Sequence, residues 1–418
     1  MEPPDEKLSQ TAGSNAPAPA HAAAPQRRLW LFRLSAAALG LLLAFAAVEI
    51  AARLVLAARP NDIETLRRFE HKKREGGPMT LINFVRISDN PRLIFELIPN
   101  LEGSFQGVPV KFNSSGRRDP ERPVTKPPGV FRIAALGDSV LFGWGAPQEW
   151  RFTDLLESFL NETTTGTKFE VLNFGVPGYN TVMEAEMLRA RALAWQPDAV
   201  LLSFIYDNDA AAPNFISRPR PLFTLSRSCA LEALLSEAAA RTRADLEAGL
   251  QGTDPKNVPD EYQYLIGWDK TRAALKDISD ICAARKMPRV FAPDYYNVEK
   301  WRGVGAAPLS DNPENEIRDY AVSLGYIDAT PVKALIEYLD THNLHSKALS
   351  VGPERADAHP NPLRHAIEAK VICERMAANG ALPDAQARAA RLPQDLARWD
   401  EIIGRARQAS NISVKYVK

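Results

Sequence analysis

The sequence predicts an α/β protein in which helices cover both faces of a mostly parallel sheet, preceded by one membrane-crossing helix. Two observations lead to this prediction. After residue 130, short apolar runs alternate with longer segments of helical periodicity, which is typical of parallel strands joined by crossover helices. Before residue 49, the twenty residues from 29 to 48 contain Arg33 as their only charged residue, and about 20 residues of helix cross the hydrocarbon core of a bilayer.

The overall composition narrows the class of protein. The chain has 418 residues, and its 51 basic and 51 acidic side chains give a formal net charge of zero, which argues against nucleic-acid binding. Cys229, Cys282 and Cys373 are too few for a disulfide scaffold, so we expect separate buried thiols with at most one bridge. The sequence has no glycine-rich phosphate loop, and His342 and His345 lack a nearby pair of carboxylates. We therefore expect neither a nucleotide cofactor nor a metal.

The N-terminal region divides into a tail and an anchor. Residues 1–28 are rich in proline and alanine and are predicted to be disordered, whereas residues 29–52 are predicted to form a retained transmembrane anchor. A cleaved signal peptide is the alternative, but the apolar stretch is long for one and charged residues follow it. A buried core helix is a further alternative, although nothing upstream would cover it. We expect the short tail inside and the large C-terminal part in the periplasm or another extracytoplasmic space, because large domains translocate whatever their charge.

The rest of the chain is predicted to be a lead-in segment, one α/β domain and a tail. The lead-in, residues 60–130, contains short extended runs and a proline-rich loop. The domain spans residues 131–382, and a predicted insertion at 210–262 is either a cap over the site or a peripheral excursion. Residues 383–418 are expected to form a helical tail. Within the domain the expected order is strand 131–136, helix 150–160, strand 169–173, helix 181–194, strand 199–204, helix 269–284, strand 289–292, a weaker strand near 326–328 and helix 362–377.

Polar residues stand where three predicted strands end, and a further group stands near the C-terminus. Gly137-Asp138-Ser139 follows the first strand, the segment from Asn173 to Asn180 follows the second, and Tyr206-Asp207-Asn208-Asp209 follows the third. Asp357-Ala358-His359 precedes the last helix of the domain. Each block alone is a weak signal, because a serine at such a turn is usually a helix cap. The carboxyl ends of parallel strands meet at one edge of a sheet, so the blocks are expected to lie together.

In this order the four blocks resemble those of the SGNH (GDSL-type) hydrolases. The segment Asn113-Ser114-Ser115-Gly116-Arg117-Arg118-Asp119 is similar to one found in a membrane-anchored bacterial branch of that family. The resemblance runs from about residue 93 to 378 and includes the preceding single helix. It implies the flavodoxin-like fold of the family, a three-layer α/β/α sandwich with a mostly parallel sheet.

The resemblance also implies roles for particular residues. Ser139 would be the nucleophile, His359 its general base, and Asp357 the carboxylate that orients the histidine. The backbone N–H groups of Ser139 and Gly178 and the side-chain amide of Asn208 would form the oxyanion hole. In a supporting role, Asp138 would fix the turn at Ser139 and Asp209 would hold the loop of Asn208.

Three of these assignments have rivals. Asp357 stands two residues before His359, whereas the common family spacing is three, so Glu354 or a Ser–His dyad helped by a backbone carbonyl is the alternative. Gly175 is the rival of Gly178. His365 is the rival base, although packing is the more natural role on its helix.

The function implied is a membrane-anchored serine esterase that hydrolyses, or transfers, an acyl group on an oxygen ester of a cell-envelope glycan or lipid. The alternative is a catalytically inactive member of the same fold that binds glycans or partners in the envelope. The sequence specifies neither the acyl group, nor its acceptor, nor the oligomeric state.

Overall fold

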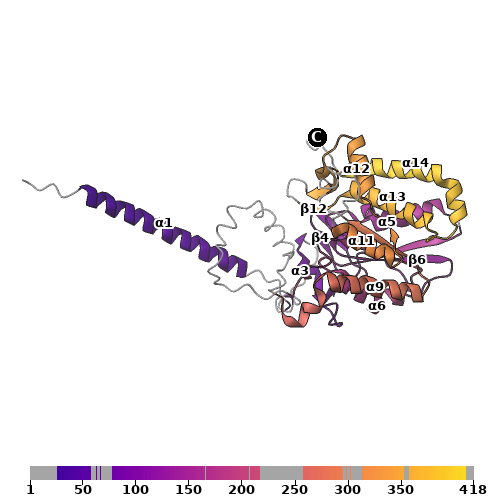
Figure 1. Cartoon of the computed structure of the whole chain (residues 1–418), viewed down its shortest axis with the longest axis horizontal. Helices are drawn as coiled ribbons and strands as arrows, with labels where there is room; N and C mark the ends of the chain where they lie inside the picture. Colours follow the sequence, from indigo (N-terminus) through magenta and orange to yellow (C-terminus); the bar gives the residue numbers. More distant parts are fainter. Residues whose placement is uncertain are drawn as a thin grey trace, which may run out of the picture.

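A computed structural model describes residues 26–57, 63, 66, 78–164, 166–206, 208–216, 258–294, 298, 302, 313–352 and 357–410. Helix α1, Gln26–Ala57, stands apart from the folded body (Figure 1). Its window Trp30–Arg53 has a mean hydropathy of 2.1 and is 0% buried inside the protein. Such a helix is long and apolar enough to cross a membrane, and a signal sequence has the same length and hydropathy. Because α1 begins at Gln26, the predicted disordered tail is wrong for residues 26–28, and residues 1–25 lie outside the described part.

The centre of the body is a five-stranded parallel sheet. The spatial order of its strands is β10-β9-β8-β6-β7, with bounds β6 Val130–Gly137, β7 Lys168–Gly175, β8 Ala199–Ile205, β9 Arg289–Asp294 and β10 Ile327–Asp328. Every residue of β8 is buried, as expected for an apolar strand covered on both faces. The chain adds β7 on one side of β6 and β8 on the other, so the winding reverses at β6. Parallel sheets bind ligands in the crevice at such a switch point, beyond the carboxyl ends of the strands.

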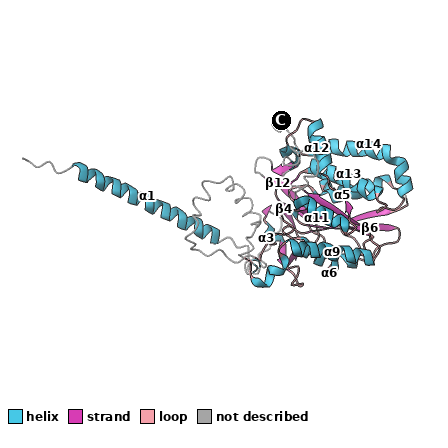
Figure 2. Cartoon of the chain, viewed as in Figure 1, coloured by secondary structure: helices cyan, strands magenta, loops and turns pink. Residues whose placement is uncertain are grey.

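Helices cover both faces of the sheet and give the predicted three layers (Figure 2). One face carries α6 (Thr181–Ala190), α9 (Trp268–Ala284) and α11 (Pro313–Ser323). The other face carries α5 (Phe152–Thr163), α12 (Val332–Thr341), α13 (Pro362–Ala378) and α14 (Ala385–Ala409). Successive side chains of a strand point to opposite faces, and accordingly Ala134 and Leu136 lie in one hydrophobic cluster while Ile133 and Ala135 lie in the other.

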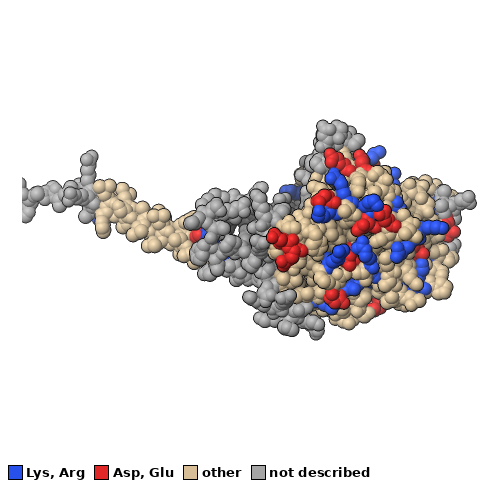
Figure 3. Space-filling model, turned by 60° about the horizontal axis from the view of Figure 1, so that its bottom comes forward, with Lys and Arg blue, Asp and Glu red and all other residues tan. Residues whose placement is uncertain are grey.

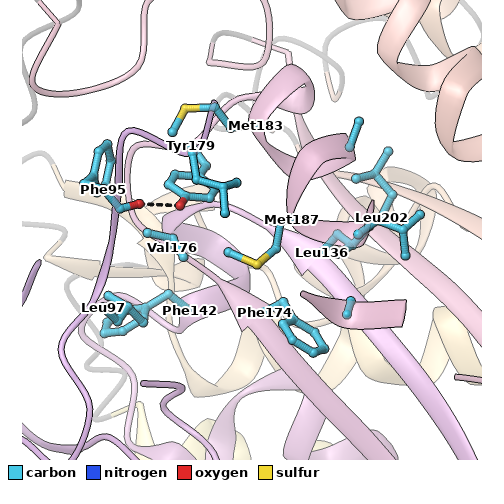
Figure 4. Packing of buried hydrophobic residues seen from close by; sticks show 14 of the residues in the cluster. Phe95, Leu97, Leu136, Phe142, Phe174, Val176, Tyr179, Met183, Met187 and Leu202 are labelled. Atoms are coloured by element: carbon cyan, nitrogen blue, oxygen red, sulfur yellow. Dashed lines mark hydrogen bonds between the residues drawn. The ribbon is translucent and has the colours of Figure 1, made fainter. Parts of the chain in front are cut away.

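The lead-in residues pack against the same core. Their elements are β1 (Pro78–Met79), α3 (Leu81–Phe84), β2 (Val85–Ile87), β3 (Phe95–Leu97), β4 (Glu102–Phe105) and β5 (Val108–Lys111). The ring of Phe84 stacks on that of Phe142 with centroids 5.7 Å apart. The hydroxyl of Tyr179 donates to the carbonyl of Phe95, as Figure 4 shows within the surrounding hydrophobic cluster. The residues before the sheet therefore share its hydrophobic core.

The predicted order of strands and helices in the domain is found, with shifts of a few residues. The predicted helix 181–194 is too long, because α6 ends at Ala190 and a 3₁₀ turn (Ala192–Trp195) follows, closed by Gln196 at φ +54°. Helices α11 and α12 were not predicted, nor was the hairpin of β11 (Ser350–Gly352) and β12 (Asp357–Pro360). Residues 217–257 of the predicted insertion lie outside the described residues. The domain boundaries themselves stay predictions.

The surface shown in Figure 3 carries charges of both signs, and the two described cysteines are buried. On the face of the body in Figure 3, basic and acidic side chains are interspersed. Cys282 and Cys373 are buried free thiols, and Cys229 lies outside the described residues.

Candidate active site

Ser139 stands at the switch point of the sheet. Strand β6 ends at Gly137, and Asp138 caps the short helix α4 (Ser139–Phe142) by accepting a hydrogen bond from the Val140 N–H at 2.9 Å. The turn needs a glycine before it, because a Cβ on Gly137 would lie 2.9 Å from the Cβ of Ser203 on the neighbouring strand. The serine is therefore the first helical residue beyond a buried strand, at the sheet edge where ligands bind.

His359 and Asp357 reach Ser139 from the hairpin strand β12. The Ser139 Oγ lies 2.8 Å from the His359 Nε2, and the His359 Nδ1 lies 2.7 Å from the Asp357 Oδ1. The backbone N–H of His359 also donates to this carboxylate oxygen, at 3.0 Å. Residues two apart on a strand point to the same side, so the two-residue spacing that departed from the family pattern brings the carboxylate to the ring.

The electrostatics of this pair favour a charged Asp357. Burial raises the pKa of Asp357, but the attraction of His359 and the hydrogen bonds from His359 and Trp144 outweigh burial. The net result is a pKa of Asp357 below its ordinary value. A carboxylate so held fixes the hydrogen on the histidine nitrogen that faces it and leaves the other nitrogen as an acceptor for the serine hydroxyl.

Trp144 contacts both of these residues, and it is not among the site residues predicted from the sequence. Its indole Nε1 donates to the Asp357 Oδ2 at 3.2 Å, and its ring stacks on the His359 ring at 4.8 Å between centroids. The side chain is 2% exposed and meets the ring of Phe105 edge-on. The available signal was the tight Gly143-Trp144-Gly145 turn, whose two glycines have φ of +80° and +68°.

Gly178 lies in a turn that only glycine fits. Its φ is +86°, and a Cβ there would lie 2.1 Å from the Asn214 Nδ2. Its carbonyl accepts from the Asn214 backbone N–H at 3.3 Å, and among the described residues its own N–H has no hydrogen-bond acceptor. The N–H of Gly175, by contrast, donates to the Asn173 Oδ1 at 2.9 Å. Of the two candidate glycines, Gly178 therefore has the N–H available to a ligand.

The side chain of Asn208 meets the turn at Ser139 but is already engaged. Its Nδ2 donates to the Asp138 Oδ2 at 2.6 Å and to the Tyr179 carbonyl at 3.1 Å. These two bonds use both amide hydrogens. The expected role in the oxyanion hole would require Asn208 to turn one hydrogen, that of the longer bond, toward a ligand.

The supporting carboxylates are deeply buried. Asp209 accepts hydrogen bonds from the Thr181 hydroxyl at 2.6 Å and from the backbone N–H of Ile205. Burial raises the pKa of Asp138, and the hydrogen bonds from Val140 and Asn208 offset part of this increase. Burial also raises the pKa of Asp209, and the charge of Asp138 adds to the effect.

Arg118 is a second residue that the sequence reading did not assign. It is 1% exposed, and its guanidinium donates to the carbonyls of Gly143 at 2.7 Å and Ala146 at 2.8 Å. Burial, together with the nearby Arg151, lowers the pKa of Arg118 to about 9. The segment that resembled the anchored branch thus ties the lead-in to the turn that carries Trp144.

The other candidates lie away from this arrangement or outside the described residues. His365 is fully buried on α13, where burial holds its pKa well below the ordinary value, and His359 is the histidine that contacts Ser139. Glu354 lies outside the described residues. His342 bonds the Tyr338 carbonyl through its ring, and the described residues include no group of three or more metal-ligating side chains.

Comparisons with known proteins give distant likenesses. No family model and no curated protein matches the chain. A two-domain esterase active on acetylated mannans is 14% identical over 61% of this chain, with a TM-score of 0.36, and the chain covers about half (51%) of that protein. An acetylxylan esterase from Geobacillus stearothermophilus is 13% identical over 59% of this chain and 94% of its own length, with a TM-score of 0.36. A putative lipolytic protein of the G-D-S-L family from Desulfitobacterium hafniense is 14% identical over 58% and 98%, with a TM-score of 0.34. Likenesses at these scores carry no argument about the reaction.

Proposed function

We propose that this chain is a membrane-tethered serine esterase of the SGNH (GDSL) type that hydrolyses or transfers an acyl group on an oxygen ester. The observation that carries the proposal is the unbroken hydrogen-bond chain from Ser139 through His359 to Asp357, with links of 2.8 and 2.7 Å. A nucleophile, a base within hydrogen-bond reach and a group that orients the base are the three parts that covalent acyl transfer requires.

The reaction follows from the positions of these groups. His359 takes the hydroxyl proton as the Ser139 Oγ attacks the ester carbonyl, and the Asp357 carboxylate stabilises the imidazolium that forms. The carbonyl oxygen becomes an oxyanion, for which the N–H groups of Ser139 and Gly178 are the proposed donors, joined by Asn208 once its amide turns. His359 then returns the proton to the departing alcohol, which leaves the acyl group on Ser139. Water, or a hydroxyl of an acceptor, attacks this acyl-enzyme with His359 again as the base. The bond between the acyl group and the Ser139 Oγ then breaks, and His359 returns the proton to this oxygen. No step calls for a metal or an organic cofactor.

The proposed position at the membrane narrows the class of substrate. Helix α1 has the length and hydropathy of a single membrane span, and the Glu49–Arg53 ion pair at 2.6 Å lies at its C-terminal end. We infer that the site works in the periplasm or an equivalent space next to the membrane. An O-acylated glycan or a lipid-linked ester of the cell envelope is the substrate class that such a tether favours.

The test of the reaction is an active-site serine probe. Purified full-length protein should react with a fluorophosphonate and cleave p-nitrophenyl acetate, and Ser139→Ala should abolish both without changing the unfolding temperature. Ser158→Ala, at an exposed position of α5, is the matched control that should retain both. A folded wild type that is neither labelled nor active would contradict the proposal and favour the inactive glycan- or partner-binding alternative.

A second measurement separates hydrolysis from transfer. The acyl-enzyme, once formed with an activated acetyl ester, is offered water alone or water with a glycan acceptor. Acetylated glycan in the product identifies transfer, and free acetate in both cases identifies hydrolysis.

The test of location is fractionation followed by protease accessibility. We expect full-length protein in the membrane fraction, with its C-terminal part digested only when protease reaches the outer side. Release of a shortened, soluble protein would instead identify α1 as a cleaved signal sequence.

A further inference from the structure

Helix α6 carries a buried glutamate that the proposed reaction does not use. Glu184 is 1% exposed, and neither of its carboxyl oxygens receives a hydrogen bond from a donor group of the described residues. Its carboxyl lies within hydrogen-bonding reach of the carboxyl of Asp209, which is fully buried. Thr181, one turn earlier on the same helix, also bonds Asp209, at 2.6 Å. Two side chains of α6 thus hold the carboxyl that follows Asn208 in the chain.

A hydrogen bond between two carboxyl groups requires one proton between them, and the surrounding donors indicate which group carries it. Asp209 receives bonds from Thr181 and from the Ile205 N–H on its two oxygens, which favours its charged form. Asp138 likewise receives bonds, from Val140 and Asn208. Glu184 receives none, so the neutral acid is the form that its surroundings favour.

The charges near Glu184 lead to the same assignment. Burial raises the pKa of Glu184 well above its ordinary value, and the carboxylates of Asp209 and Asp138 raise it further. An ionised Glu184 would add a third negative charge to a site where the two neighbouring charged groups are already carboxylates. Such a charge would push Asp209, and the turn that contains it, away from α6.

We propose that Glu184 is a positioning residue that donates its carboxyl hydrogen to Asp209 and so fixes the turn that presents Asn208 to Asp138. The turn is short, since the backbone N–H groups of Asn208 and Asp209 both donate to the Ile205 carbonyl, at 3.0 and 2.9 Å. A shift of Asp209 therefore moves Asn208 with it. This inference rests on the proposed esterase function, because the readout is the reactivity of Ser139.

Two substitutions separate the effect of the Glu184 hydrogen bond from the effect of a charge at this position. Glu184→Gln keeps a neutral donor in nearly the same volume, and it should retain a fluorophosphonate labelling rate and kcat within about twofold of wild type. Glu184→Leu fills the space but removes the donor, and losing one hydrogen bond to a charged acceptor should lower both rates about tenfold. Because the change acts on the oxyanion side of the reaction, kcat should fall while KM stays nearly constant. Glu186→Gln, two residues along α6 and outside the site, is the control that should behave as wild type.

Infrared difference spectroscopy supplies a readout that a purely structural role would not change. At neutral pH, the spectrum of wild type minus Glu184→Gln should contain the carbonyl stretch of a protonated carboxylic acid. Absence of that band would overturn the proposal, as would equal losses in the Gln and Leu variants, since these would show that the charge matters. A Leu variant as reactive as wild type would also overturn it. Failure of the wild type to label at all would reject the esterase assignment instead, so the two failures are distinguishable.

Discussion

Replacing Trp144 by phenylalanine should slow the proposed reaction without unfolding the site. Phenylalanine keeps a ring to stack on His359 and to meet Phe105, but it removes the 3.2 Å hydrogen bond from the indole to Asp357. Hydrogen bonds to charged groups contribute about 1.5–3 kcal/mol. The length of this bond and the partial exposure of Asp357 place it at the lower end, so we expect about a tenfold loss, which corresponds to about 1.4 kcal/mol.

The loss should appear in kcat, because the orientation of Asp357 matters most when His359 becomes an imidazolium in the transition state. Steady-state hydrolysis of p-nitrophenyl acetate and the fluorophosphonate labelling rate measure it. Trp144→Leu removes the stacking as well, worth a further about 0.5–1.5 kcal/mol, and should also lower the unfolding temperature. Asp357→Asn is the reference variant for a complete loss of the orienting carboxylate, because the same exchange in a serine protease triad lowers kcat about 10⁴-fold.

Two results would refute this reasoning. If Trp144→Phe reacts at the wild-type rate while Asp357→Asn is strongly impaired, the indole does not orient the carboxylate. If Asp357→Asn is itself as reactive as wild type, the orienting role belongs elsewhere, as in the Ser–His dyad alternative.

Three further predictions concern the surroundings of the site. Gly178→Ala should destabilise the fold and abolish labelling, because its Cβ would lie 2.1 Å from the Asn214 Nδ2. Gly166→Ala is the control, because Gly166 has a similar φ of +88° and a Cβ there would have nothing within 4 Å. This control should lower the free energy of unfolding, measured with denaturant, by only the backbone cost of about 1–2 kcal/mol. Arg118→Met should lower the free energy of unfolding by about 3 kcal/mol, because it leaves buried carbonyls without a charged donor, and it should slow labelling as well; a variant that is destabilised but labels normally would contradict the link to the turn. Burial raises the pKa of Asp119 to about 7 from its ordinary 3.8, so the stability that this carboxyl contributes is fully present below pH 3.8 and is lost as the pH rises through about 7. The unfolding temperature of wild type should therefore fall relative to Asp119→Asn over that pH range, and a constant difference would show that Asp119 is ionised throughout.

The sheet could be predicted from the sequence because buried parallel strands are short apolar runs, and each run here is followed by a glycine or a polar residue. The family resemblance also implied that Ser139 and His359 meet, as they do across 220 positions. The hairpin of β11 and β12 was missed because its strands are very short and their register shifts between Ser350 and Gly352. Alternation of hydrophobic residues gives no signal over three or four positions.

The residues around the site were missed for a different reason. The two glycines beside Trp144 indicate a turn but not a partner for its indole, and Arg118 and Glu184 have the charges expected of a surface. What assigns them is burial together with a partner from another segment: carbonyls of the turn after α4 for Arg118, and Asp209 for Glu184. A single sequence contains no record of such pairs, because the partners are brought together only by the packing of the lead-in and α6 on the sheet.

The lead-in lies in the chain between α1 and the domain that contains Ser139. It follows α1 in the chain. Its Phe84 packs on Phe142, the last residue of the helix of Ser139, and its Phe105 packs on Trp144, just beyond that helix. Arg118 then fixes the same turn through its carbonyls. The part of the chain that follows the proposed membrane anchor is therefore also the part that packs against the turn beyond Ser139, the proposed nucleophile.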